Sequence, residues 1–320
     1  MKAVVCRAYG LAGLGLEEVE APHPGDAEVL LRVRAAALNA LDWHLLRGTP
    51  FAARLFFGLR RPRTTRPGRD VAGVVEAVGA KVTRFAPGDA VFGSCRGAFA
   101  ESALAAEKSL TPLPAGVPFE QAAALPVAGL TALQGLRDAG RLRSGQQVLV
   151  HGAGGGVGTF AVQIARALGA EVTAATRAES LETMRALGAV RVLDHEREDF
   201  TASGERWDLI FDCYSHHPLS ACRRALKPGG RYVAAGGPFP SLTSILVDAL
   251  ARSALSLFGS RKLLSILARS SPGDLALLGE WVAEGKLRPV VDLRFGLAAV
   301  PGAIRDLAEG RARGKIVVVP

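Results

Sequence analysis

The sequence contains little cysteine, and its cysteines stand far apart. The four residues are Cys6, Cys95, Cys213 and Cys222, and no two of them form a Cys-x-x-Cys pair. This spacing argues against a zinc ribbon and against a disulfide scaffold. The N-terminal residues also lack the apolar core and small-residue cleavage site of a secretory signal. We therefore expect a reduced, cytoplasmic protein.

Long uninterrupted apolar stretches are missing as well. The longest candidate, residues 241–267, is interrupted by Asp248, Arg252, Arg261 and Lys262. Four charges are too many for a membrane-spanning helix, so we expect no transmembrane segment. The partly helical spacing of leucine and isoleucine predicts a buried helix pair or a subunit contact, and a partner-binding or lipid-facing surface is the alternative. We expect a homodimer.

Basic residues outnumber acidic ones without forming a run. The chain has 39 Lys+Arg against 30 Asp+Glu, a net charge of +9, yet nowhere do five basic residues stand together. Nucleic-acid binding would require a recognition motif beside the charge, and none is present, so no nucleic-acid partner is expected. The excess favours small anionic ligands such as a phosphorylated cofactor, although general arginine richness would give the same balance.

One glycine-rich segment is the most informative feature that is present. It reads Val148-Leu-Val-His-Gly-Ala-Gly-Gly-Gly-Val-Gly158, with an apolar run before it and helical periodicity after it. Strand, glycine turn and helix together suit a pyrophosphate, because glycines let the backbone approach and the helix N-terminus offers free N–H groups. A merely flexible glycine loop would not explain the flanking elements. We expect a dinucleotide to bind at Gly152, Gly154, Gly155, Gly156, Val157 and Gly158.

The end of the next predicted strand indicates which dinucleotide binds. An NAD-dependent protein usually places a carboxylate there to accept from the ribose 2′-hydroxyl. This chain has Thr176 and Arg177 instead. A hydroxyl and a guanidinium suit a 2′-phosphate, and there is no carboxylate to repel it. NADPH is therefore the expected cofactor, and a solvated Arg177 at a helix start is the alternative.

A change of pattern near residue 118 divides the chain, whose 320 residues are expected to form two domains. Before it, short apolar runs alternate with turn residues and indicate β-rich structure. After it, strands and helices alternate, which predicts a doubly wound parallel sheet. The expected parallel strands are 148–150, 172–174, 191–193, 209–211 and 232–234, with helices at 119–124, 130–139, 181–187 and 219–226. Past about residue 270, helices at 274–283 and 300–308 and strands at 290–295 and 316–319 are expected.

Five ordered motifs resemble the medium-chain dehydrogenase/reductase superfamily, within it the quinone oxidoreductase group. They are residues 37–48, 68–79, 85–93, 123–132 and 310–318, and with the glycine loop they span essentially the whole chain. The resemblance implies an α/β fold in which a GroES-like, β-rich catalytic domain, residues 1–118 completed by about 271–320, accompanies a doubly wound Rossmann domain, residues 119–270. It also implies an active site in a cleft.

Zinc-dependent members of this superfamily hold their metal with Cys, His and a further Cys or Asp. The matching positions here hold Asn39, Arg69 and about Val127, and none of these is a plausible zinc ligand. We therefore expect no metal. Hydride acceptors that need less Lewis-acid help remain, namely a quinone or an α,β-unsaturated carbonyl. The alternative is a non-catalytic, cofactor-binding or membrane-associated protein on the same fold.

The resemblance also implies roles for individual residues. Asn39 is expected near the nicotinamide, where its amide would contact the acceptor oxygen. Asp42 is expected to take part in catalysis or to fix the loop by accepting backbone N–H groups. His44 would relay a proton or serve as a hydrogen-bonding residue nearby. Thr131 would place a hydroxyl close to the nicotinamide unless it bonds within its own helix. His195 matches a position used for the adenosine phosphate, with a solvated loop histidine as the alternative.

Overall fold

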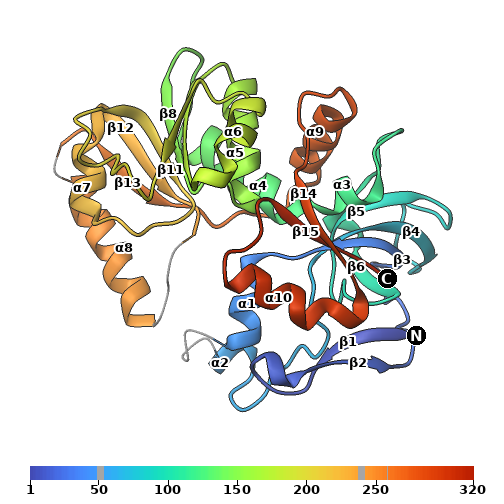
Figure 1. The fold of residues 1–320 in the computed structure, drawn as a ribbon. Helices are drawn as coiled ribbons and strands as arrows, with labels where there is room; N and C mark the ends of the chain where they lie inside the picture. Colours follow the sequence, from blue (N-terminus) through green and yellow to red (C-terminus); the bar gives the residue numbers. More distant parts are fainter. Residues whose placement is uncertain (49–53, 237–241, 258) are drawn as a thin grey trace. The chain divides into compact units, whose positions relative to one another are not determined.

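The computed structural model describes residues 1–48, 54–236, 242–257 and 259–320, and these form two compact units. Unit 1 comprises Met1–Ala128 and Ser270–Pro320, and unit 2 comprises Gly129–Arg269 (Figure 1). The N-terminal and C-terminal parts of the chain thus share one unit. Residues 119–128, which the sequence pattern assigned to the nucleotide-binding domain, group with unit 1.

Unit 1 is built on a seven-stranded sheet in the order β14-β15-β3-β4-β5-β7, with β6 also paired to β3, and on a separate β1-β2 pair. Its core follows the strand period: Val29, Leu31 and Val33 are buried in β3, whereas Arg32 and Arg34 face solvent. The strands are β1 Lys2–Cys6, β2 Leu14–Glu18, β3 Glu28–Ala37, β4 Asp70–Val78, β5 Ala90–Ser94, β6 Ser102–Ala106, β7 Leu110–Pro112, β14 Val291–Gly296 and β15 Lys315–Val319.

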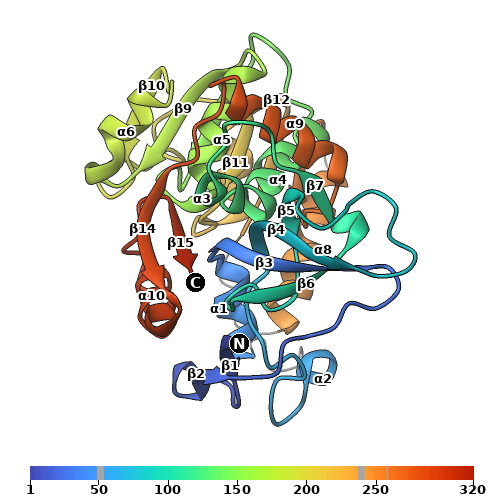
Figure 2. The ribbon, with the colours of Figure 1, turned by 90° about the vertical axis from the view of Figure 1, so that its right-hand side faces the viewer.

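The register of the sheet places distant parts of the chain side by side. Ala37, the last residue of β3, lies opposite Asp70 of β4 on one side and opposite Val317 of β15 on the other. Figure 2 shows β14 and β15, the two C-terminal strands, running next to each other. Because β3 and β15 are antiparallel, Lys315 comes level with Asn39, two residues beyond the end of β3.

The helices of unit 1 are short apart from two near the C-terminus. They are α1 Ala40–Arg47, α2 Arg54–Phe57, α3 Phe119–Ala123, α9 Pro272–Ala283 and α10 Val300–Ala308, with 3-10 turns at Leu11–Gly13, Glu107–Ser109 and Leu297–Ala299. Ser271 caps α9, its hydroxyl accepting the backbone N–H of Asp274 at 3.2 Å. Val300 and Ile304 of α10 are buried in the core of this unit.

Unit 2 contains a six-stranded, wholly parallel sheet in the order β10-β9-β8-β11-β12-β13. The first strand, β8, is central. Strands β9 and β10 lie on one side of it, and β11, β12 and β13 lie on the other. This order is the doubly wound topology, in which ligands bind at the carboxyl ends of the two central strands. The strands are β8 Gln147–His151, β9 Glu171–Thr176, β10 Arg191–Asp194, β11 Trp207–Asp212, β12 Leu226–Ala234 and β13 Lys262–Ser265.

The connecting helices of unit 2 follow the expected order, with one difference at the first. α4 spans Pro126–Gln134 and therefore begins four residues earlier than the predicted helix at 130–139; the rest of that range, Gly135–Ala139, is a π-helical turn. Proline suits a first helical position, where its missing N–H costs nothing. The remaining helices are α5 Gly156–Ala167, α6 Leu181–Ala186, α7 Leu219–Arg224 and α8 Leu242–Leu257, with a 3-10 turn at Ala178–Ser180.

The second half of unit 2 contains one irregular strand and corrects one expectation. The Lys-Pro-Gly-Gly segment 227–230 lies inside β12: Trp207 pairs with Leu226 and Leu209 with Arg231, so the sheet accommodates the segment as a register shift. Residues 241–267 do not form a helix pair. They contain α8 and then β13, whose Leu263 is buried against the core, while residues 241 and 258 lie outside the described part of the chain.

Candidate active site

The glycine loop joins the central strand β8 to helix α5, and different features of the local structure explain its glycines. Gly152 adopts φ +75°, a conformation that side chains rarely allow. A Cβ on Gly158 would lie 2.3 Å from the carbonyl oxygen of Gly152, and one on Gly154 would lie 2.5 Å from Oγ1 of Thr176. The positive φ thus explains Gly152, and close packing explains Gly154 and Gly158.

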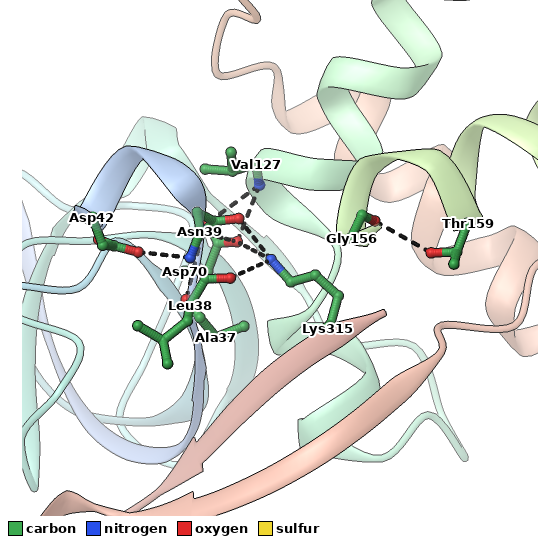
Figure 3. Close-up of polar contacts among 9 residues, drawn as sticks. All are labelled: Ala37, Leu38, Asn39, Asp42, Asp70, Val127, Gly156, Thr159 and Lys315. Carbon is green, nitrogen blue, oxygen red and sulfur yellow. Dashed lines mark hydrogen bonds and ion pairs between the residues drawn. The ribbon is translucent and has the colours of Figure 1, made fainter. Parts of the chain in front are cut away.

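Gly155 differs, because a Cβ there would meet only the Gly152 carbonyl oxygen, at 3.5 Å, and otherwise open space. It is the N-cap of α5, so the first N–H groups of the helix follow it directly. Thr159 closes the first turn, its hydroxyl donating to the Gly156 carbonyl at 3.3 Å (Figure 3). Open space in front of a helix N-terminus is what a dinucleotide pyrophosphate requires, so the residues present fit that group.

The end of β9 presents the two residues expected at a 2′-phosphate. Thr176 closes the strand and is 3% exposed, and Arg177 follows it at the surface. Nε of Arg177 lies 3.5 Å from Oε1 of Glu196, an exposed pair that sequence inspection missed because the two residues are far apart in the chain.

A buried acid closes the second central strand at the same edge of the sheet. Asp212 ends β11, lies opposite His151 in the register, and faces its Nδ1 at 2.9 Å. Its carboxylate also accepts the backbone N–H groups of Tyr214 and Ser215 and, at 2.8 Å, the hydroxyl of Tyr232. Burial opposes ionisation, but the hydrogen bond and charge of His151 and the backbone donors hold the pKa of Asp212 at about 2. An aspartate that ends an apolar strand is the signal that could have revealed it.

His195 lies beside His151 and Tyr214 rather than in open solvent. Its ring stacks on Tyr214 with centroids 5.5 Å apart and meets the edge of His151 at 5.6 Å. Nδ1 of His195 is buried without a hydrogen-bond partner. Burial, and secondarily the nearby His151, lowers the pKa of His195, so its imidazole is neutral at pH 7.

In unit 1 the side chain of Asn39 is at the centre of a buried polar cluster (Figure 3). Nδ2 of Asn39 donates to Oδ2 of Asp70 at 2.9 Å and lies 3.4 Å from the carbonyl oxygen of Ala37. Oδ1 of Asn39 accepts from Nζ of Lys315 at 2.6 Å. Asn39 is also the only asparagine in the whole chain.

Asp70 and Lys315 complete the cluster, which we call the Asn39 cluster (Asn39, Asp42, Asp70 and Lys315). Lys315 lies 3.6 Å from Oδ2 of Asp70 and donates to the carbonyl oxygen of Leu38 at 3.0 Å. Asp70 further accepts the backbone N–H of Val127 at 3.2 and 3.3 Å. Asp70 is 0% and Lys315 2% exposed, so both charges depend on these partners. Burial raises the pKa of Asp70 and lowers the pKa of Lys315, and their mutual attraction opposes both effects.

Sequence analysis did not identify Asp70 or Lys315 as site residues. Each stands at the start of an otherwise apolar strand, Asp70 before Val-Ala-Gly-Val-Val and Lys315 before Ile-Val-Val-Val. A charge at such a position is a signal of a buried ion pair, but the sequence does not say which charges meet.

Asp42 makes the contact that a loop-fixing role requires. It lies in the first turn of α1, and its Oδ2 accepts the backbone N–H of Asn39 at 2.8 Å. Asn39 is the N-cap of that helix, so this bond ties the site residue to the helix start. Burial raises the pKa of Asp42 to about 7, although the hydrogen bond from Asn39 lowers it.

Asp42 is expected to make stability depend on pH. A carboxyl whose pKa is higher in the folded state than its unfolded value of about 4 stabilises the fold fully below pH 4. This contribution is lost as the pH rises through about 7. Asp42→Asn keeps an acceptor for Asn39 but does not titrate, so between pH 5 and pH 8 the urea midpoint should fall less in the variant than in the unaltered protein. Parallel curves would contradict this assignment.

The other two expected catalytic residues lie in the helices α1 and α4. His44 lies two residues beyond Asp42 in α1 and is half-buried, and burial followed by the charge of Arg47 lowers its pKa. Thr131 lies in α4 in unit 2 and is 9% exposed. The structure therefore brings together Asn39 and Asp42, adds Asp70 and Lys315, and leaves the roles of His44 and Thr131 as predictions.

No group of three or more His, Cys, Asp or Glu side chains within residues 1–48, 54–236, 242–257 and 259–320 has the arrangement of a metal site. Of the three positions that the resemblance matched to zinc ligands, Asn39 binds Lys315 and Asp70, and Val127 contributes its backbone N–H. Across the same ranges, no helix is long and apolar enough to cross a membrane.

Comparison with known proteins identifies the family. Residues 25–115 match the alcohol dehydrogenase GroES-like domain, and residues 187–318 match a zinc-binding dehydrogenase domain. The chain is 35% identical to the chloroplastic quinone-oxidoreductase QR1 of Triphysaria versicolor, covering 100% of this chain and 98% of the relative. It is 32% identical to 2-methylene-furan-3-one reductase of Solanum lycopersicum, covering 100% of this chain and 79% of the relative.

The solved structures agree with the sequence comparisons. The quinone oxidoreductase from Coxiella burnetii superposes with a TM-score of 0.88 at 29% identity, covering 100% of this chain and 99% of that one. The chain therefore belongs to the medium-chain dehydrogenase/reductase superfamily, in its quinone oxidoreductase group. The predicted α/β fold, with a GroES-like domain and a Rossmann domain, is confirmed. The protein is an oxidoreductase of the class that includes quinone and enone reductases, and its cofactor is a nicotinamide dinucleotide.

Proposed function

We propose that this protein is an NADPH-dependent, zinc-independent reductase of quinones or α,β-unsaturated carbonyl compounds. The observation that carries the choice of cofactor is the end of β9, where Thr176 and Arg177 stand in place of a carboxylate. A guanidinium can bind a phosphate through two parallel, charge-assisted N–H donors. A ribose 2′-hydroxyl carries no negative charge and cannot form such a pair of bonds. The open space at Gly155 and the N–H groups that begin α5 support a pyrophosphate site at the adjoining strand.

The cofactor and the residues of the chain have different proposed roles in the reaction. Bound NADPH supplies the hydride, and the chain binds and orients the reactants. Asn39 supplies an amide N–H to the carbonyl or quinone oxygen, on which negative charge develops during the reaction. Water or His44, which is neutral at pH 7 because burial lowers its pKa, passes on the proton. Asp42 holds the Asn39 backbone in place.

Arg177→Ala tests the choice of cofactor. Loss of a charge-assisted contact worth about 1.5–3 kcal/mol should raise the Kd for NADPH by roughly ten- to a hundredfold and leave that for NADH nearly unchanged. Arg197 is a matched control, because it is exposed, lies close by in the sequence, and pairs with Asp194 at 3.6 Å. Arg197→Ala should change neither constant by more than about twofold.

A substitution at Glu196 should change the Kd for NADPH in the opposite direction. Because its carboxylate approaches the Arg177 guanidinium, Glu196→Gln should tighten NADPH binding, provided that Arg177 is present. Equal affinity of the unaltered protein for NADPH and NADH would overturn the proposed preference. Binding of NADPH without reduction of any quinone or enone in a broad panel would instead favour a non-catalytic role.

Zinc independence leads to a separate expected result. Asn39 and Arg69 offer no thiolate or imidazole to a metal, so the purified protein should contain far less than one zinc per chain. Its turnover should also be unchanged by a strong chelator. Elemental analysis before and after chelation would check both points. One zinc per chain, lost together with activity, would show that the assignment of these positions is wrong.

Two further expectations concern the protein in its surroundings. We propose that it acts in the cytoplasm as a homodimer. Light scattering on the protein as it leaves a size-exclusion column would measure its molar mass. The mass of a monomer would contradict the proposed homodimer.

A further inference from the structure

The orientation of the Asn39 side chain is fixed by charges on both of its ends. An asparagine amide has an oxygen that accepts and a nitrogen that donates, and the two ends have nearly the same shape. Here the oxygen lies 2.6 Å from the ammonium of Lys315 and the nitrogen 2.9 Å from the carboxylate of Asp70. Rotating the amide by half a turn would place N–H groups against an ammonium and an oxygen against a carboxylate. Both contacts would then be repulsive, and both lie in a buried site where charge is poorly screened.

Lys315 cannot easily turn away from this arrangement. It is 2% exposed and donates to Leu38 O and Asn39 Oδ1, while Oδ2 of Asp70 attracts its charge from 3.6 Å. Its place at the start of β15 is fixed by the sheet, since Leu38 donates its backbone N–H to Ile316 at 3.0 Å. The ammonium is therefore held where it meets the amide oxygen.

We propose that Lys315, together with Asp70, is a positioning residue that locks Asn39 as a hydrogen-bond donor. One amide N–H is used by Asp70, and the other has only the carbonyl oxygen of Ala37, at 3.4 Å, a length at which a hydrogen bond is weak. A substrate that reaches this side chain meets an N–H and never an oxygen. The site therefore suits a hydrogen-bond acceptor, such as a carbonyl or quinone oxygen, and offers no acceptor to the proton of an alcohol O–H. The ammonium also polarises the amide and so strengthens its N–H groups as donors.

This inference rests on the proposed function for its catalytic consequence, but the lock itself can be measured without a substrate. Because Asn39 is the only asparagine, protein labelled with ¹⁵N at the asparagine side chain has a single amide group in its NMR spectrum. In the unaltered protein its two hydrogens should resonate separately and exchange slowly with water. In Lys315→Met exchange should be at least about tenfold faster. Lys286→Met, a change at an exposed lysine paired with Glu284, is the matched control and should leave the signals as they are.

Kinetics and stability of a small set of variants separate positioning from mere support of the fold. Lys315→Met leaves the Asp70 carboxylate buried without its cation, so it should lower both the melting temperature and kcat, the latter by at least about tenfold. Lys315→Met with Asp70→Asn removes both charges and should recover most of the melting temperature while kcat stays low. Cofactor affinity should be unchanged in both variants, because the glycine loop belongs to unit 2.

Each outcome decides a different point. Unchanged NMR signals in Lys315→Met would overturn the lock. Recovery of kcat along with stability in the double variant would overturn the positioning role and leave Lys315 as a structural residue. If the unaltered protein reduced no acceptor at all, the proposed function would fall, and the NMR result would still decide whether the amide is locked.

Discussion

Asn39→Ala should lower kcat about a hundredfold, the scale on which removal of one donor to a developing oxyanion acts. The amide that the variant loses is the group proposed to meet the acceptor oxygen. NADPH affinity should stay nearly intact, because the glycine loop and Arg177 lie in the other unit. Single-turnover measurements at saturating NADPH would give the rate of the hydride step directly.

The buried neighbours of Asn39 require a second variant as a control. Removal of the amide takes one hydrogen bond from Asp70 and one from Lys315, so some stability will also be lost. Asn39→Asp keeps the acceptor for Lys315 and removes the donor, and it too should be slow. A folded Asn39→Ala protein with full kcat would show that another group stabilises the oxygen, and Tyr214 or Thr131 would be the next to test.

Substitutions at two glycines of the β8–α5 loop should have large and contrasting effects. A methyl group at Gly155 would have room in the protein but would occupy the space in front of the helix N-terminus. Gly155→Ala should therefore weaken NADPH binding about a hundredfold, since charge-assisted hydrogen bonds to the pyrophosphate are worth about 1.5–3 kcal/mol each. Its melting temperature should stay near that of the unaltered protein, because Gly155 has φ −83°, which alanine readily adopts.

Gly158→Ala is the matched comparison within the same loop. Its Cβ would lie 2.3 Å from the Gly152 carbonyl oxygen and 2.6 Å from atoms of Ala153, so backbone has to move. Overpacking of this kind costs about 1–3 kcal/mol of unfolding free energy. Calorimetry and cofactor titration would distinguish the two variants. If Gly155→Ala bound NADPH as tightly as the unaltered protein, the pyrophosphate would not lie at this helix start.

The nucleotide-binding half of the fold could be predicted because its signals are local. The strand ending at His151, the glycines, and the helix from Gly156 follow one another within about 20 residues, as the motif requires. Strand β13 was missed for the opposite reason. It is only four residues long at an edge of the sheet, and its leucines belong equally well to a helical pattern.

The candidate site in unit 1 was predicted only in part, because its contacts are not local. The family motif pointed to Asn39 and Asp42, which are three residues apart. Asp70 is 31 residues and Lys315 is 276 residues from Asn39 in the chain, and only the register of β3, β4 and β15 brings them together. Nothing in a single sequence pairs a lysine with one asparagine at that separation.

The position of β15 also has a consequence for how the protein is made. This strand is synthesised after all the others in its sheet, yet it inserts between β14 and the end of β3. Until the ribosome has synthesised β15, the backbone at Ala36 to Leu38 has no partner strand on the side that β15 later occupies. Such an unpaired edge can pair with other chains. The nascent protein can thus complete its glycine loop long before its Asn39 cluster. The cluster proposed to take part in the chemistry is therefore completed later in synthesis than the loop proposed to bind the cofactor.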